Sequence, residues 1–76
     1  MNNTFLNDNQ IDLMAGAAVT SYEFTADWSD ALHAAVEYSI DEFGIKPRKS
    51  AALLAVKIAK TKWMAASYAV KREVVQ

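Results

Sequence analysis

Four polar residues in the middle of the chain are spaced so that a helix would place them on one face. They are Asp30, His33, Glu37 and Asp41. Their separations of three, four and four positions give a row along one helix side, which we refer to as the acidic row. A D-x-x-H pair with two more carboxylates would make half of a carboxylate-bridged metal site in a helical bundle, and a symmetric second chain would supply the rest. Bundle metal sites face inward, however, and this row lies opposite the apolar side of its helix. We therefore predict a solvated acidic face open to a partner, and no metal or other cofactor.

A second set of residues forms a basic stripe on the C-terminal part of the chain. The stripe comprises Lys49, Lys57, Lys60, Met64, Tyr68 and Lys71. At 100° per residue its four lysines fall within about 80° of one another, in a sector that the methionine, the tyrosine and Leu53 share. Such a surface suits an acidic protein groove. It also suits single-stranded nucleic acid, whose phosphates meet lysines while bases stack on rings. A third interpretation is that the lysine stems only cover apolar side chains at the edge of the core.

Two tryptophans, Trp28 and Trp63, are further candidates for a binding site, because tryptophan is favoured at binding hot spots. Each lies on the apolar arc of its helix among small residues. We therefore predict that both pack in the core, where they supply most of the buried bulk.

Enzymatic chemistry finds little support in this sequence. Cysteine is absent, and the single histidine, His33, has no serine at a spacing that makes a nucleophile and base pair. The two glycines, Gly16 and Gly44, start no phosphate-binding loop. We expect a protein that is not an enzyme.

Helical periodicity extends over nearly the whole chain, and no segment alternates as a strand would. The first helix is predicted over about residues 8–22, where apolar residues recur every three or four positions, with Asn7 or Asp8 as its N-cap. Gly16 weakens this helix by about 1 kcal/mol relative to alanine. The small residues around it are suited to a close crossing with a neighbouring helix.

The second and third helices are separated by a well-marked turn. We predict the second over about residues 26–43, with Thr25 as its N-cap and Gly44 as the left-handed residue that ends it. Pro47 is predicted to occupy the first position of a long third helix over about residues 47–74, which contains no further glycine or proline.

Lys62 separates two apolar sectors of the third helix. One sector comprises Ala55, Val56, Ala59, Trp63, Ala66 and Val70, and the other comprises Leu54, Ile58, Ala65 and Ala69. Together they cover more of the helix than one neighbouring hairpin buries, which favours a homodimer.

Charge is strongly segregated along the 76 residues, whose net charge is −1. Eight of the nine acidic residues precede Lys46, and all eight basic residues lie at or after it. Such asymmetry indicates either a charged partner or complementarity within the fold. We expect one domain over residues 8–76, preceded by a flexible arm over residues 1–7.

The apolar share of 53% includes fourteen alanines, which favour helix but bury little area each. No uncharged apolar run approaches the roughly 20 residues of a membrane span, and no basic start typical of a signal peptide is present. We expect no membrane association and a cytoplasmic protein.

These observations predict an all-α, three-helix domain in which two shorter acidic helices pack on one long basic helix, assembled as a homodimer. Its expected role is a small binding or inhibitory module acting through protein–protein contacts, as a phage-type inhibitor of host machinery does. The alternative is a nucleic-acid-binding accessory protein that uses the basic stripe.

Overall fold

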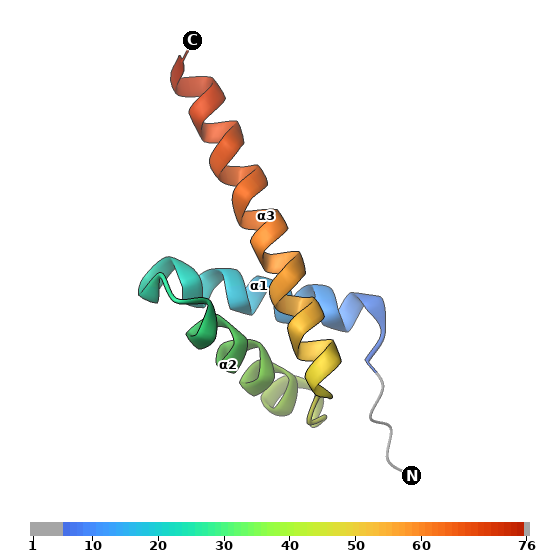
Figure 1. Cartoon of the computed structure of the whole chain (residues 1–76). Coiled ribbons are helices and arrows are strands. Elements are labelled where there is room, and N and C mark those ends of the chain that lie inside the picture. Colours follow the sequence, from blue (N-terminus) through green and yellow to red (C-terminus); the bar gives the residue numbers. More distant parts are fainter. Residues whose placement is uncertain (1–5, 76) are drawn as a thin grey trace.

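The computed structural model describes the backbone of residues 6–75 and the side chains of residues 6–66. It contains three α-helices, with a short π-helix continuing the second (Figure 1). The elements are α1 (Asp8–Thr25), α2 (Trp28–Tyr38), η1 (Ser39–Phe43) and α3 (Lys49–Val75). The described residues include no strand. The prediction of an all-α, three-helix domain is therefore confirmed.

Helix α1 begins at a capping box. The Asn7 side chain accepts a hydrogen bond from the Gln10 backbone N–H at 2.7 Å, and the Gln10 side chain accepts one from the Asn7 N–H at 2.9 Å. Two N–H groups that the helix leaves unpaired are satisfied in this way. Leu6, just before the capping residue, packs against the core. Residues 1–5 lie outside the described residues.

The boundary between α1 and α2 differs from the prediction. Thr25 is the last residue of α1 and not the cap of α2, since α1 runs on to Ala26, whose left-handed backbone (φ 57°) ends it. Asp27 caps α2 instead, accepting a hydrogen bond from the Ser29 N–H at 2.8 Å. Threonine and aspartate are both good N-caps, and the left-handed turn at Ala26 leaves only Asp27 in the extended conformation that a cap needs.

The second helix stops where the sequence predicts, although its last turn is π-helical. Gly44 is left-handed (φ 67°), and its N–H donates to the Ile40 carbonyl at 3.0 Å. The Ser39 hydroxyl, fully buried, donates to the Ile45 carbonyl at 2.6 Å and closes the turn. A buried hydroxyl with its partner in place costs little and fixes the chain reversal.

The start of α3 also differs from the prediction, because the first helical residue is Lys49 and not Pro47. The Arg48 carbonyl accepts the first helical hydrogen bond, from the Ala52 N–H at 3.0 Å. Arg48 thus stands directly before the helix. Pro47 lies outside α3, in the link that follows Gly44.

Substituting alanine for each glycine is expected to change stability in opposite directions. A Cβ at Gly16 or Gly44 would meet no heavy atom within 4 Å, so the backbone alone decides the outcome. Gly16→Ala is expected to stabilise the fold by about 1 kcal/mol, because alanine favours the helix interior. Gly44→Ala is expected to destabilise it by about 1–2 kcal/mol, because its Cβ disfavours the left-handed region. Urea unfolding followed by circular dichroism at low protein concentration measures both; equal signs would contradict this account.

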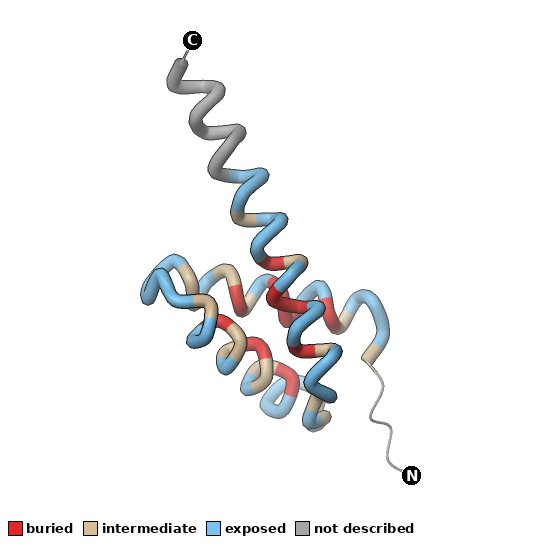
Figure 2. The backbone as a smooth tube through the Cα atoms, in the orientation of Figure 1, coloured by how far each residue is buried: buried red, intermediate tan, exposed pale blue. Residues whose placement is uncertain are grey.

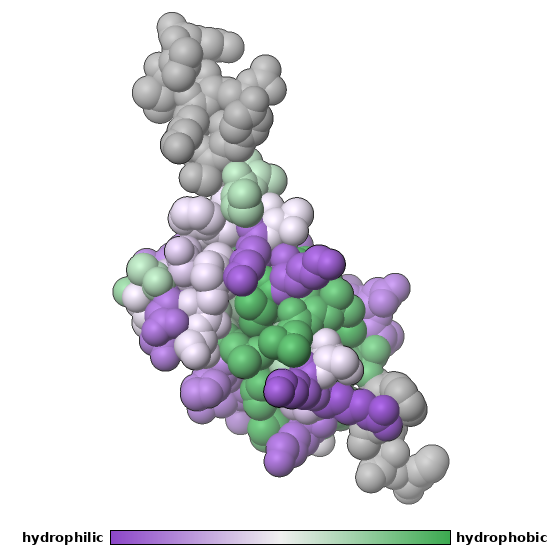
Figure 3. All heavy atoms as spheres, in the orientation of Figure 1, coloured by the Kyte–Doolittle hydropathy of each residue, from purple (hydrophilic) through white to green (hydrophobic). Residues whose placement is uncertain are grey.

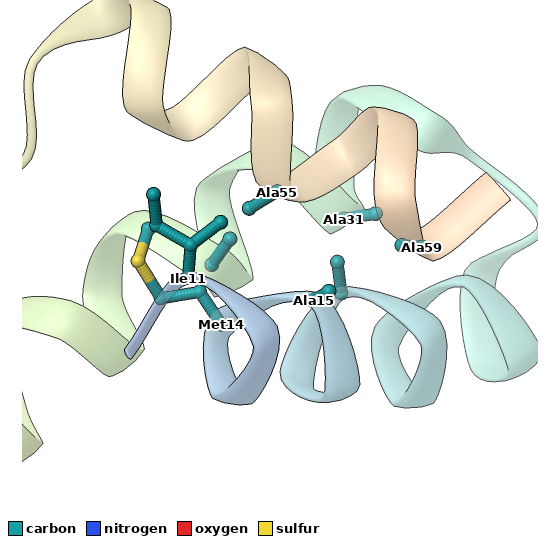
Figure 4. Packing of buried hydrophobic residues seen from close by; sticks show 8 residues of the cluster. Ile11, Met14, Ala15, Ala31, Ala55 and Ala59 are labelled. Carbon is teal, nitrogen blue, oxygen red and sulfur yellow. The ribbon is translucent and has the colours of Figure 1, made fainter. Parts of the chain in front are cut away.

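The core lies where the three helices meet and consists largely of alanine (Figure 2). The central cluster comprises Ile11, Met14, Ala15, Ala18, Ala31, Ala35, Ala55 and Ala59. In Figure 4 the labelled alanines of α1, α2 and α3 point toward one another, with Met14 and Ile11 beside them. Such small side chains let the helix backbones approach closely. Helix α3 continues past the other two helices (Figure 1).

Candidate protein-binding face

The acidic row is exposed along its whole length. Asp30, His33 and Glu37 come from α2, and Asp41 comes from η1. None of the four forms an ion pair with another described residue. Among the described residues no group of three or more histidines, cysteines, aspartates or glutamates is arranged to hold a metal. Within the part of the chain whose side chains are described, the row presents carboxylates to solvent without a cationic partner.

The described members of the basic stripe are exposed on one side of α3. Lys49, Lys57, Lys60 and Met64 all reach solvent, and Met64 is 64% exposed. Tyr68 and Lys71, the other two predicted members, lie outside the residues whose side chains are described. Leu53, 49% exposed, lies in the same sector, so the stripe alternates lysines with exposed apolar side chains. Figure 3 shows apolar side chains gathered over the N-terminal half of α3 with hydrophilic ones around them.

An aromatic cluster lies beside the stripe, where the end of α1, the start of α2 and the middle of α3 converge. The Tyr22 and Trp28 rings are stacked, with centroids 3.8 Å apart and planes 11° apart. Trp63 meets Tyr22 edge-on at 5.3 Å. The Lys60 ammonium lies 5.6 Å from the centroid of the Trp28 ring, within the range of a cation–π contact. This contact ties one lysine of the stripe to the rim of the core.

The position of the tryptophans corrects the prediction that they fill the core. Trp28 and Trp63 are half-buried, and the largest fully buried hydrophobic side chain is Met14. Alanines and Met14 occupy the centre of the core, and Trp28 packs against this cluster from its edge. The sequence reasoning also missed the role of Tyr22. Its place on the apolar arc of the first helix was visible, but its stacking on Trp28 depends on the turn at Ala26.

The two charged surfaces do not neutralise each other within the described part of the chain. The one ion pair found there joins Lys62 of α3 to Asp12 of α1 at 2.7 Å, and neither residue belongs to the acidic row or the stripe. Lys62 thus links α3 to α1 between the two apolar sectors. Lys49 and Lys57 have no carboxylate partner among the described residues. Their charge is available to another molecule.

The two apolar sectors of α3 differ in burial. In the first, Ala55, Val56 and Ala59 are buried. In the second, Leu54 remains 44% exposed and Ile58 is half-buried. The hairpin of α1 and α2 therefore covers the first sector only as far as Ala59, since Trp63 is half-buried and Ala66 is exposed, and it leaves much of the second sector open.

Comparison with known proteins yields no matching family model, no matching curated protein and no matching solved structure. Within the described residues, no helix combines the length and apolar character needed to cross a membrane. The function is accordingly inferred from the chemistry of this chain's own surface.

Proposed function

We propose that the chain is a non-enzymatic binding module that recognises an acidic protein surface through the basic stripe of α3. The observation that carries the proposal is the alternation of exposed lysines, which have no carboxylate partner among residues 6–66, with exposed apolar residues on one helix side. Lys49 and Lys57 supply charge, while Leu53 and Met64 supply apolar area. Charge steers encounter and sets specificity, and the apolar contacts provide affinity. Where the covered surface is needed for the partner's own activity, binding inhibits that partner.

Three features favour a protein partner over nucleic acid. The sequence pI is about 5.7, well below the basic values typical of nucleic-acid-binding domains. The exposed acidic row on the neighbouring helix repels a phosphate backbone. Trp28 offers little room for a base, because its ring is already stacked on Tyr22 and approached by Lys60.

We expect Lys57→Glu to reduce partner recovery about tenfold or more when the tagged chain is used to isolate proteins from a lysate of its own organism. Lys46→Glu is the matched control, since Lys46 is equally a described, exposed lysine but lies outside the stripe. A protein retained by the wild type and by the control, but lost with Lys57→Glu and at raised salt, supports the proposal. Circular dichroism checks that both variants keep their helices.

Two results would overturn this assignment. One is a set of bound proteins that is the same for Lys57→Glu and for the wild type. The other is binding of single-stranded oligothymidine at low salt that falls steeply as salt rises and is lost with Lys57→Glu, which would establish the nucleic-acid alternative.

A further inference from the structure

Four neighbouring residues of α3 form a symmetric pattern along the basic stripe. They are Leu53, Lys57, Lys60 and Met64, which we call the quartet. Their separations of four, three and four positions place them along one side of the helix, over about 16.5 Å. All four are exposed, Leu53 at 49% and Met64 at 64%. The quartet therefore presents an apolar residue, two cations and an apolar residue, an order that reads the same in both directions.

The charges of the quartet are not neutralised by the described part of the chain. Neither lysine has a carboxylate partner among residues 6–66. The Lys60 ammonium lies 5.6 Å from the centroid of the Trp28 ring, a contact that restricts this lysine without removing its charge. The Thr61 hydroxyl, beside the quartet, donates to the Lys57 carbonyl at 3.1 Å and so does not compete for an incoming acceptor. Two cations held between apolar ends are thus open to an acidic ligand.

We propose that the acidic partner docks a helix on the quartet, and that this helix carries two carboxylates between two apolar residues. The inference rests on the function proposed above and specifies its partner. Carboxylates opposite Lys57 and Lys60 pair with both charges, and apolar side chains opposite Leu53 and Met64 cover the exposed ends. The partner helix repeats the separations of the quartet, so the pattern LxxxExxExxxL describes it in either direction.

The spacing of the quartet favours a helix over an extended segment. Two helices that pack side by side rise by the same amount per residue, so their contacts stay in register along the quartet. In an extended segment, residues on one side are about 6.7 Å apart, and four of them span about 20 Å. The two lysines are only about 4.5 Å apart along the helix axis. A helix therefore matches both the inner pair and the apolar ends, whereas a strand overshoots both.

This chain does not carry the complementary pattern, so a second copy does not fit the quartet. Among its nine acidic residues only Asp27 and Asp30 are three positions apart, and the residues four before and four after them are Glu23 and Ala34. Two quartets facing each other would bring lysines opposite lysines in either direction. The occupant of the quartet is therefore a different protein.

Two synthetic peptides of identical composition test the helix. The first presents LxxxExxExxxL in an alanine-based sequence, held helical by a lactam bridge on its other side because free peptides of this length are marginal helices. The second exchanges the leucines and the glutamates. Fluorescence anisotropy with the full chain is expected to show that the first peptide binds about tenfold tighter or more. Equal affinity, or no binding of either peptide, would overturn the proposal.

Charge reversal tests whether the peptide binds at the quartet. Lys57→Glu combined with Lys60→Glu is expected to weaken binding of the first peptide about tenfold or more, and a peptide with lysines in place of its glutamates is expected to bind this double variant instead. Lys46→Glu is the control, because Lys46 is exposed and lies outside the quartet. Circular dichroism checks that each variant remains helical. A folded double variant that binds the first peptide as the wild type does would contradict the assignment.

The peptide and lysate experiments can fail separately. A lysate partner that depends on Lys57, without any preference between the two peptides, would retain the binding function and overturn the helix. A set of bound proteins that does not depend on Lys57 would overturn both. In sedimentation equilibrium, a dimer with a mass near twice 8.4 kDa that Lys57→Glu dissociates would place a second copy on the quartet and overturn the proposal. Binding to phosphatidylserine vesicles that the double variant loses would indicate a membrane surface instead and would also overturn it.

Discussion

The Ala59→Leu variant is expected to lose much of its stability, with a melting temperature lowered by roughly 10 °C. Ala59 is fully buried on α3, within the cluster where α3 meets α1 and α2. Leucine adds three heavy atoms at a helix crossing that alanines hold close, and such overpacking costs typically about 1–3 kcal/mol. A chain this short has a total stability of the order of 5 kcal/mol, so the loss is large. Thermal and urea unfolding at fixed protein concentration measure it.

Ala66→Leu is the matched control for this substitution. Ala66 lies seven residues after Ala59, on nearly the same side of the helix. It is exposed, because α3 has there passed beyond the alanine crossing. The change in unfolding free energy is expected to stay within about 0.5 kcal/mol. An equal loss in both variants would mean that leucine disturbs α3 itself and not the crossing.

Met14→Ala is expected to destabilise the fold by about 2–5 kcal/mol. Met14 is fully buried and is the largest hydrophobic side chain that is completely shielded from solvent. Its neighbours are mostly alanines, which are too short to fill the volume that the thioether leaves. The cavity would therefore persist and add to the lost transfer free energy. Urea unfolding gives the free energy from the midpoint and slope.

Met64→Ala provides the comparison, since it removes the same atoms from a side chain that is 64% exposed. Its expected effect on unfolding is within about 0.5 kcal/mol. A difference of less than 1 kcal/mol between the two variants would contradict the placement of Met14 at the centre of the core.

Local signals predicted the helices well wherever one residue type was suited to a special conformation. The left-handed Gly44 is a case of this kind and functions as expected. At the start of α1 the sequence left Asn7 and Asp8 open as the cap, and the structure selects Asn7, which forms a capping box with Gln10. The prediction of the second N-cap was wrong because two nearby residues were equally suited to capping the helix. Thr25 and Asp27 compete for one cap, and the left-handed turn at Ala26 selects Asp27.

The π-helical turn had no signal in the sequence at all. It places Ser39 so that its hydroxyl reaches the Ile45 carbonyl six residues ahead. A contact of this range depends on how the chain reverses direction, and helical periodicity does not report on that.

The candidate binding surface was likewise predicted in part from the sequence. Exposure of the acidic row, and of stripe members such as Lys57 and Met64, follows from helix geometry, because residues opposite an apolar arc face solvent. The aromatic cluster of Tyr22, Trp28 and Trp63 joins three helices and was beyond the reach of periodicity.

The sequence by itself determined three helices, the order of their charges and the sides of each helix that carry them. These properties arise from backbone hydrogen bonds, caps and spacings between residues close together in the chain. Only the tertiary structure decided which alanines are buried, that Met14 and not a tryptophan occupies the centre, and that Lys62 pairs with Asp12. The reason is that helices with many small side chains on their apolar faces can pack against one another with more than one crossing point. The crossing that forms fixes which apolar residues, among them Leu13 and Phe24, remain uncovered.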